Sequence, residues 1–371
     1  PARASVTYVA RPGSPDRQGC LAQLDRALAS EAKGQRFESS SIRHHPPRYP
    51  ALCMTANFAL LGIGGFVAPR HLKAIADNGG NLVAACDPFD SVGILDKHFP
   101  DAAFFTEVER FDRFLEKRRR ESSAAAVQYV SVCSPNYLHD AHCRLAMRLG
   151  AHAICEKPLV INPWNLDQLS VIEGETNARV YTVLQLRLLP SLIALKARLA
   201  EDAAKGVRHQ VLLSYATRRG RWYDVSWKGD EAKSGGLVTN IGIHLMDLMV
   251  WLFGAAREAE VHQRERDRVS GYLSLEHADV RWLLSTRTAD LPMAVRDAGG
   301  HAHRTLTLDG DEIEFSGGFT DLHTQVYSEI LAGRGFGIED ARPSIELSHR
   351  LRTADLVTPR PERAHPQLVA E

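Results

Sequence analysis

The segment from residue 57 to residue 87 constrains the fold of this chain more than any other part of the sequence. An apolar run at 57–61 precedes a glycine-rich turn at 62–68, and a helical stretch then leads to a second apolar run at 82–86 that ends at Asp87. A glycine turn between a strand and a helix, followed by an acidic residue after the next strand, is typical of a dinucleotide-binding βαβ unit. We therefore expect a nucleotide-binding sheet in this part of the chain.

The glycine turn supplies candidate cofactor ligands. Gly62 permits the tight turn, and Gly64 lets the backbone approach a pyrophosphate. Gly65 and Phe66 follow at the start of the helix, where free N–H groups would point at the phosphates. Asp87 would accept hydrogen bonds from the ribose hydroxyls and repel a 2′-phosphate, so the sequence favours NAD over NADP. The sixth position of the glycine pattern is a valine, and an ordinary βα turn is the alternative.

The alternation of strands and helices continues to about residue 155. The pattern predicts a helix at 107–120, a strand at 127–133, a helix at 137–149 and a strand at 151–155. Alternating elements of this length imply a parallel, doubly wound sheet with right-handed crossovers. Ligands of such sheets bind beyond the carboxyl ends of the strands, which directs attention to residues 134–136 and 156–158.

The motif Glu156-Lys157-Pro158 follows an apolar strand on this cofactor side. Lys157 could hold a substrate hydroxyl, or lower the pKa of that hydroxyl by its charge. The proline restricts the backbone of Lys157 to extended conformations and so helps to aim its side chain. A solvated charge is the alternative for a lysine after a strand.

The second motif is SGGLVTNIGIHLMD, residues 234–247. Apolar positions at helical spacing predict a helix from Asn240 onward, on which Asn240 and His244 share one face. His244 could accept a proton near neutral pH, and Asn240 could fix a substrate group by hydrogen bonding. Asp247 either orients the His244 imidazole or is a solvated charge, and a satisfied core histidine is the alternative for His244.

Basic and aromatic side chains gather in or beside the loop that precedes this second motif. Arginine and lysine suit an anionic ligand, and aromatic faces could stack on a base or pack against a sugar. A solvated basic loop over apolar residues is the alternative. The members of this group are Arg187, Arg219, Arg221, Trp222, Tyr223, Trp227 and Lys228.

Four motifs together resemble the glucose–fructose oxidoreductase/inositol dehydrogenase (Gfo/Idh/MocA) superfamily: the dinucleotide turn, SPNxxH from residue 134, EKP and GGxxxxxGxHxxD. The resemblance implies an α/β protein with an N-terminal Rossmann domain and a C-terminal α/β domain built on an open, mostly antiparallel sheet. It implies that Lys157 and His244 form the catalytic pair, in roles that could be exchanged. It also implies that further cofactor contacts come from Ser134, Asn136, His139, Glu156 and Gln185.

Longer stretches at 153–169, 219–254 and 312–347 closely resemble the UDP-N-acetylglucosaminuronate 3-dehydrogenases of that superfamily, and the resemblance covers essentially all of 57–353. It implies NAD-dependent oxidation of the 3-hydroxyl of UDP-N-acetyl-D-glucosaminuronate. Leu189 departs from the subfamily, which commonly has a histidine before this proline. The residues implied on the substrate side are Lys157, Arg187, Arg221, Tyr223, Lys228, Asn240 and His244.

The same resemblance carries further expectations about the reaction and the assembly. It implies that 2-oxoglutarate reoxidises NADH in place, and that the product feeds bacterial surface polysaccharide (lipopolysaccharide, O-antigen) biosynthesis. A homo-oligomer, expected to be a tetramer, would cover the exposed face of the open sheet. Two alternatives stay open: another sugar or cyclitol dehydrogenase of the superfamily, and a non-catalytic NAD-binding regulatory protein. After the second sheet we expect a turn at 311–318 and a helix at 321–332. The first residues of that helix, 321–324, are expected to return towards the site.

The composition argues against several classes of protein. The chain has 371 residues, with 45 Lys and Arg against 45 Asp and Glu, and this balance argues against a nucleic-acid partner. No apolar run approaches the roughly 20 residues of a spanning helix, so we expect no membrane insertion. The six cysteines show no paired CxxC spacing, so we expect buried reduced thiols, no metal site and a cytoplasmic location.

The composition shifts at Met54. The 53 residues before it hold six of the 18 prolines and eight basic residues against four acidic ones, without a sustained helical or strand period. The stretch 21–40 resembles a transfer-RNA gene read through as protein, because 36–39 can be back-translated to contain GTTCGAATCC. We expect 1–53 to be a non-native or disordered extension, with Met54 as the initiator. The expected division continues with a Rossmann domain at 54–178, a substrate and oligomerisation domain at 179–355 and a tail at 356–371.

Overall fold

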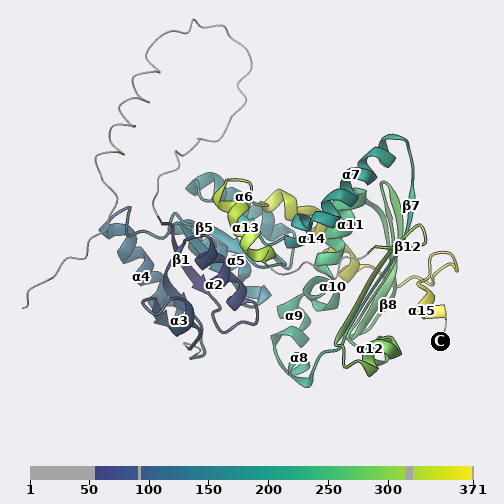
Figure 1. Ribbon diagram of the computed structural model, residues 1–371, viewed down its shortest axis with the longest axis horizontal. Helices are drawn as coiled ribbons and strands as arrows, with labels where there is room; N and C mark the ends of the chain where they lie inside the picture. Colours follow the sequence, from purple (N-terminus) through teal and green to yellow (C-terminus); the bar gives the residue numbers. More distant parts are fainter. Residues whose placement is uncertain (1–54, 91–92, 314–320, 370–371) are drawn as a thin grey trace, which may run out of the picture. The chain divides into compact units, whose positions relative to one another are not determined.

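The computed structural model describes residues 55–90, 93–313 and 321–369 (Figure 1). The extension expected over residues 1–53 and the start expected at Met54 therefore lie outside the described residues. So does most of the turn expected at 311–318.

The first sheet has six parallel strands in the order β3-β2-β1-β4-β5-β6. The parallel, doubly wound sheet is confirmed. Its central strands are apolar along their length because both faces are covered. The boundary expected at residue 178 falls one strand too early, since β6 pairs with β5. The strands are β1 (Asn57–Leu61), β2 (Asn81–Cys86), β3 (Ala103–Phe105), β4 (Tyr129–Val132), β5 (His152–Cys155) and β6 (Val180–Thr182).

Helices from the first half of the chain lie on both faces of this sheet. Along β1, Phe58 and Leu60 join the apolar cluster of α2 and α3, whereas Ala59 and Leu61 join the cluster of α4, α5 and α6. Alternate residues of a strand point to opposite faces, which explains this division. The helices are α2 (Ala68–Asp77), α3 (Gly93–His98), α4 (Val108–Glu121), α5 (His139–Arg148) and α6 (Trp164–Thr176).

Two helices from the end of the chain return to the first sheet. In α13 (Leu322–Leu331), Val326, Tyr327 and Ile330 join the α2 and α3 cluster together with residues of β5 and β6. The helix α14 (Ile338–Thr353) joins the opposite cluster through its first half and the core of the second sheet through its second half. The two halves of the chain therefore share their cores, and Met54–Glu371 forms one compact unit.

The second sheet has six strands in the order β12-β11-β7-β10-β9-β8. Only β7 and β10 pair in parallel within it, so the open, mostly antiparallel sheet is confirmed. The helices α7 (Pro190–Ala204), α11 (Ile243–Phe253) and α14 cover one face around the fully buried Trp282 (Figure 1). The strands are β7 (His209–Thr217), β8 (Ala256–Arg264), β9 (Arg268–Leu275), β10 (Ala278–Ser285), β11 (Ala302–Leu308) and β12 (Asp311–Glu312).

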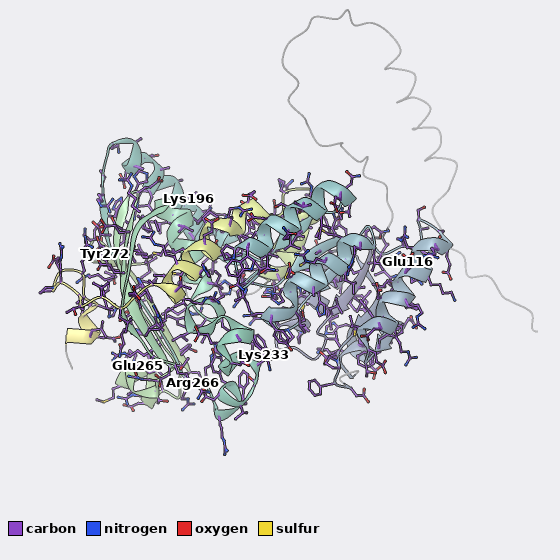
Figure 2. All side chains as sticks on the ribbon, turned by 180° about the vertical axis from the view of Figure 1, so that it is seen from behind. Glu116, Lys196, Lys233, Glu265, Arg266 and Tyr272 are labelled. Carbon is purple, nitrogen blue, oxygen red and sulfur yellow. The ribbon has the colours of Figure 1, made fainter. Side chains whose placement is uncertain are left out.

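Side-chain contacts and short helices complete the structure. Lys196 of α7, which is labelled in Figure 2, has its Nζ 4.8 Å from the ring centroid of Trp251 in α11. The expected tail packs on the second sheet, where the His365 ring is buried and its Nε2 lies 3.0 Å from Ser214 Oγ. The remaining helices are η1 (Asn136–Leu138), η2 (Gln185–Leu188), α8 (Arg221–Val225), η3 (Trp227–Gly229), α9 (Glu231–Ser234), α10 (Gly236–Asn240), η4 (Thr288–Asp290), α12 (Met293–Asp297) and α15 (Pro366–Val369).

Among the described residues, no single helix is long and apolar enough to cross a membrane. The bent pair Glu231–Asn240 and Ile243–Phe253 passes by length and composition when taken together, and most of Ile243–Phe253 is buried in the core. The four cysteines that the structure describes, in β2, after β4, in α5 and in β5, are buried free thiols, as expected.

Gly62 gives a test of the turn after β1. Its φ is +88°, and a Cβ atom there would lie 2.6 Å from the carbonyl carbon of Cys133. We expect Gly62→Ala to lower the free energy of unfolding by about 2–5 kcal/mol, from the left-handed backbone and the clash with Cys133. Gly79→Ala is the control, because φ is +69° there with nothing within 4 Å, and should cost only about 1–2 kcal/mol. Equal losses in urea unfolding would contradict the role of the close contact.

Candidate active site

The predicted cofactor ligands follow the carboxyl ends of five neighbouring strands. Gly62 follows β1, Asp87 follows β2, Ser134 comes two residues after β4, Glu156 follows β5, and Gln185 comes shortly after β6. Because all six strands are parallel, these ends meet at one edge of the sheet. This edge is where α/β sheets bind dinucleotides.

The glycine turn is held by the residue that we expected to contact ribose. Asp87 is buried, and its Oδ2 accepts a hydrogen bond of 2.8 Å from the N–H of Gly64. A Cβ atom at Gly65 would lie 3.0 Å from the Gly62 carbonyl oxygen and 3.2 Å from that of Cys133, so the chain is tightly folded here. The turn has the close-packed backbone that a bound pyrophosphate requires, and the residues present fit a dinucleotide.

His139 joins the two segments that follow β4 and β5. Its Nδ1 lies 2.7 Å from the carbonyl oxygen of Pro158, and its Nε2 lies 2.8 Å from that of Ser134. The ring is 1% exposed, and burial lowers the pKa of this imidazole. The His139 ring therefore links the SPN and EKP segments by hydrogen bonding, at the edge where we expect the cofactor.

Gln185 presents an unpaired acceptor at the same edge. Its side chain is buried, and its Oε1 accepts no hydrogen bond within the described part of the chain. A buried carbonyl oxygen without a donor is costly. An amide donor on a bound ligand, such as the carboxamide of a nicotinamide, would satisfy it.

Asn136 links the cofactor side to the second motif. Its Nδ2 donates to the Ser234 carbonyl oxygen at 2.9 Å and to Asn240 Oδ1 at 3.3 Å. Asn240 Nδ2 donates to the Tyr223 hydroxyl at 2.9 Å, and Lys157 Nζ donates to the Asn240 carbonyl oxygen at 3.4 Å. The structure thus brings together predicted residues from four separate segments.

The single helix expected from Asn240 onward is wrong. Asn240 is the last residue of α10, the chain turns at 241–242, and His244 lies in α11, whose axis is bent by 45° from the preceding helical segment. Gly242 is packed at this turn, since a Cβ atom there would lie 2.6 Å from the Val238 carbonyl oxygen and 2.5 Å from Leu284. The two side chains therefore reach the site from two helices.

His244 and Lys157 form the predicted catalytic pair, and both are half-buried. Burial, and then repulsion from the charge of Lys157, hold the pKa of His244 well below 6.5. Burial also lowers the pKa of Lys157 below 10.5, and the charge of Glu156 opposes this effect. His244 is therefore a neutral imidazole near pH 7, which is the form that accepts a proton.

The structure corrects the expectations for Arg187 and Asp247. Arg187 is buried, and its Nε and Nη2 donate to the two carboxylate oxygens of Asp247 at 3.0 and 2.8 Å. Its Nη2 also donates to the carbonyl oxygen of Asp340 at 2.8 Å. Asp247 is therefore neither a partner of His244 nor a solvated charge, and the Arg187 guanidinium is used within the protein instead of facing a substrate.

Leu189, which departs from the subfamily pattern, is a core residue. It is 4% exposed and belongs to the apolar core beneath the second sheet. An apolar side chain at this position is explained by the packing of the core.

The loop before the second motif pairs cations with aromatic rings. Lys228 is half-buried, and its Nζ lies 5.0 Å from the Trp222 ring centroid and 4.5 Å from that of Trp227. Arg219 lies over Tyr223 at 5.9 Å, whereas Arg221 is exposed. Lys233 of α9, which is labelled in Figure 2, has its Nζ 6.0 Å from the ring centroid of Tyr137. The distances to the rings are those of cation–π contacts.

Two residues of the second sheet were missed by the sequence analysis. Arg304 of β11 lies 4.8 Å from the ring of Tyr215 in β7 and donates to its hydroxyl at 3.4 Å. Burial raises the pKa of Tyr215, but the charges of Arg304 and Arg219 outweigh it and lower that pKa below its ordinary value. All three groups act on the pKa of Lys157. Arg304 and Tyr215 stand on strands without a motif, so the sequence offered no indication of these two residues.

This geometry agrees with the comparisons with known proteins. The chain matches the model of an oxidoreductase family with an NAD-binding Rossmann fold over residues 56–184, and the model of that family's C-terminal α/β domain over residues 208–303. It therefore belongs to the Gfo/Idh/MocA oxidoreductase family, and the expected superfamily is confirmed.

Individual members of known function or structure are similar to this chain to different degrees. The WlbA (WbpB) dehydrogenase of Thermus thermophilus, solved in complex with NAD and UDP-GlcNAcA, is 50% identical with a TM-score of 0.80, and the match covers 84% of this chain and 100% of that chain. Its complex with NAD and α-ketoglutarate gives 51% identity, a TM-score of 0.81 and the same coverage. The D-glucoside 3-dehydrogenase of Escherichia coli is 27% identical over 142 residues, which is 37% of this chain and 39% of that protein.

Asp87 allows a test of the cofactor site. We expect Asp87→Ala to weaken NAD binding by roughly 10- to 100-fold, or about 1–3 kcal/mol, because hydrogen bonds to the ribose and the bond that holds the Gly64 N–H are lost. Discrimination against NADP should relax in the same variant. Asp90→Ala is the control, since Asp90 is an exposed acid in the same loop. Unchanged NAD affinity in a calorimetric titration would remove Asp87 from the cofactor site.

Proposed function

We propose that this chain oxidises the 3-hydroxyl of UDP-N-acetyl-D-glucosaminuronate to the 3-keto sugar with NAD. The observation that carries the proposal is the 50% identity to the Thermus thermophilus dehydrogenase. The match extends over the whole of that chain, and that dehydrogenase was solved with NAD and UDP-GlcNAcA. Lys157, Asn240 and His244, the residues expected to act on the substrate, gather beside the cofactor edge of the first sheet.

The residues of the first half would hold the cofactor. The turn at Gly62, Gly64 and Gly65 would receive the pyrophosphate, and Asp87 would bind the ribose. Gln185 Oε1 is a buried acceptor without a partner in the described chain, which suits the nicotinamide end. When bound, NAD supplies a hydride acceptor for the carbon that carries the hydroxyl.

The catalytic pair would handle the proton and the charge. His244 takes the proton of the 3-hydroxyl while the hydride leaves C3, and Lys157 stabilises the developing alkoxide by its charge and hydrogen bond. The neutral state of the His244 imidazole supports its role as the base. Exchange of the two roles is the alternative, with Lys157 as the base.

The loop before the second motif would recognise the anionic substrate. Arg221 and Lys228 offer charges for the pyrophosphate or the carboxylate, and the rings around Lys228 offer faces for the uracil or the sugar. Tyr223 and Asn240 would fix sugar hydroxyls, since they already share a hydrogen bond at 2.9 Å.

The proposal extends to the second substrate and the setting. The complex of the Thermus thermophilus relative with α-ketoglutarate supports 2-oxoglutarate as the final acceptor, which becomes 2-hydroxyglutarate by gaining the hydride and a proton. We place the reaction in the cytoplasm, in the synthesis of bacterial surface polysaccharide. An open sheet with a face to cover supports a homo-oligomer, and we propose a tetramer.

A second candidate is oxidation of the 3-hydroxyl of a simple D-glucoside. The 27% identity to the Escherichia coli D-glucoside 3-dehydrogenase favours it, although that match spans less than two thirds of either protein. The two candidates differ in the need for a nucleotide on the sugar.

One incubation separates the candidates. We expect the purified protein with UDP-N-acetylglucosaminuronate, NAD and 2-oxoglutarate to form 2-hydroxyglutarate and a 3-keto sugar, both measured by mass spectrometry. Free glucosides and cyclitols form the comparison panel. Turnover of free sugars with none of UDP-sugars would overturn the proposal in favour of the second candidate. Binding of NAD without turnover of any of these compounds would point to a non-catalytic protein.

The catalytic pair is tested by substitution. We expect Lys157→Met and His244→Asn each to lower kcat by roughly 10²- to 10⁴-fold, the usual effect of a positioned acid–base group. The double variant should be little worse than the poorer single variant, because the two residues act as one unit. NAD affinity should hold in His244→Asn. Lys117→Met, on the exposed face of α4, is the control and should leave kcat unchanged.

The pH profile of kcat identifies the base in the same set of variants. Only neutral imidazole accepts a proton, so activity should be constant near pH 7 and fall as the pH drops through the pKa of His244, which lies below 6.5. This acidic limb should disappear in His244→Asn. If the limb persists with full kcat, His244 is a core histidine and Lys157 becomes the first candidate base.

A further inference from the structure

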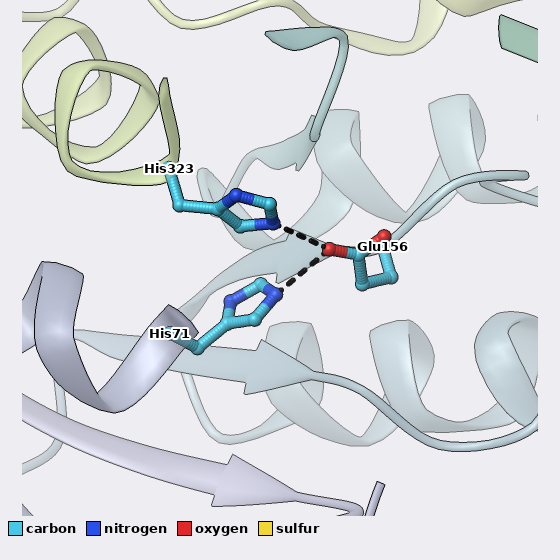
Figure 3. A group of neighbouring side chains, drawn as sticks. All are labelled: His71, Glu156 and His323. Carbon is cyan, nitrogen blue, oxygen red and sulfur yellow. Dashed lines mark hydrogen bonds and ion pairs between the residues drawn. The ribbon is translucent and has the colours of Figure 1, made fainter. Parts of the chain in front are cut away.

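A buried carboxylate next to Lys157 is held by two histidines from distant parts of the chain (Figure 3). His71 comes from α2 and His323 from α13, and the Nε2 atom of each lies 2.9 Å from Glu156 Oε1. The relative exposures are 0% for His71, 5% for Glu156 and 6% for His323. None of the roles proposed above uses the two histidines.

The hydrogen-bond network continues from His71 to Tyr327 and Ser131, and these contacts indicate which ring nitrogen of His71 carries the proton. His71 Nδ1 lies 2.7 Å from the Tyr327 hydroxyl, which lies 2.5 Å from Ser131 Oγ. If His71 donates from Nε2 to Glu156, its Nδ1 accepts from Tyr327, and Tyr327 accepts from Ser131. This arrangement satisfies the buried polar groups along the chain of bonds with a neutral imidazole.

The distances favour hydrogen bonds over a metal ion. The three ligand atoms of His71, Glu156 and His323 lie within 4.8 Å of one another, so the donor set resembles a zinc site. Ligand atoms in a tetrahedral zinc site lie about 3.3 Å apart, because each is about 2.05 Å from the metal. The observed separation of 2.9 Å between each nitrogen and Oε1 is instead that of a hydrogen bond.

The same carboxylate also holds the backbone of the catalytic lysine. Glu156 Oε2 accepts a hydrogen bond of 3.2 Å from the N–H of Lys157. The backbone N–H of Glu156 itself donates to the Val132 carbonyl oxygen at 2.9 Å. The position of the carboxylate therefore constrains the start of the Lys157 side chain, whose Nζ reaches the Asn240 carbonyl oxygen.

A carboxylate in this position needs its donors. Burial raises the pKa of Glu156, but the hydrogen bonds from His323 and His71 outweigh it and hold that pKa well below 4.5. A buried ion that loses a partner loses the compensation for its desolvation. Glu156 would then move towards water or take up a proton, and its bond to Lys157 would weaken.

We propose that His71 and His323 are positioning residues that hold the Glu156 carboxylate and, through it, set the backbone of Lys157. The inference rests on the role proposed for Lys157 in the reaction. His323 lies in α13, so a helix from the end of the chain takes part in placing a residue of the first half.

The first test needs no substrate, so it stands even if the proposed reaction fails. We expect His323→Leu to speed amide hydrogen exchange of the Lys157 N–H by at least about tenfold, because the bond to Glu156 Oε2 loosens. His323→Gln should keep the native rate, since its amide can donate from near the Nε2 position. Residue-resolved exchange by NMR spectroscopy or electron-transfer fragmentation measures this.

The second test is kinetic and uses UDP-N-acetylglucosaminuronate. We expect His323→Leu and His71→Leu to lower kcat by about 10- to 100-fold through misplacement of Lys157, with KM changed less than about threefold. His323→Gln should recover most of kcat. His209→Leu is the matched control: His209 is also 6% exposed, and its Nδ1 lies 2.7 Å from Asp309 Oδ2 at the far end of β7. It should lower stability without changing kcat or the exchange of Lys157.

Three outcomes would overturn the proposal. The first is native exchange at Lys157 together with native kcat in folded His323→Leu. The second is a His323→Gln variant as impaired as His323→Leu, which would make ring shape the cause. The third is one equivalent of zinc in the purified protein by elemental analysis. If His323→Leu does not fold, His323→Asn replaces it, because its shorter amide cannot donate from the Nε2 position, and the same contrast with His323→Gln applies.

Discussion

A parallel sheet needs cover on both faces, and the helices of the first half leave part of one face bare. The helices α2 and α3 pack beneath β1 and β2, whereas α4, α5 and α6 all lie on the opposite face. The area beneath β5 and β6 is filled by α13, from more than 130 residues later in the chain. The need to cover this face therefore packs the two halves of the chain together and brings residues of α13 to the candidate site.

The consequence for chemistry follows from what α13 presents. A purely apolar helix would cover the sheet equally well, but α13 brings His323 to Glu156 at the end of β5 and Tyr327 to Ser131 of β4. Together with His71 they allow an ionised carboxylate to remain buried beside Lys157. That negative charge opposes the effect of burial on the pKa of Lys157. Burial, and then the charge of Lys157, lower the pKa of the neighbouring His244.

The substrate side is built by a different kind of contact. Arg187 forms an interior ion pair with Asp247, so in our proposal the loop that precedes α10 recognises the anion. In that loop Lys228 lies between two tryptophan rings, and Arg304 lies over Tyr215 on the second sheet. Asn136 and Asn240 join this side to the cofactor edge by a direct hydrogen bond. The SPN and EKP motifs of the first half thus contact the second motif through the polar groups of Asn240.

The sequence by itself determined the features that are local. The apolar runs of β1, β2, β4 and β5, the glycine turn at Gly62 and the acid at Asp87 follow from short patterns, because a strand and the turn after it are adjacent in the chain. The three-residue strands β3 and β6 are too short to show such a pattern, and the turn at 241–242 depends on how Gly242 packs against Leu284. The tertiary structure alone decided the pairing of Arg187 with Asp247 and of Glu156 with His323, since residues 60 and 167 positions apart meet only after the helices have packed.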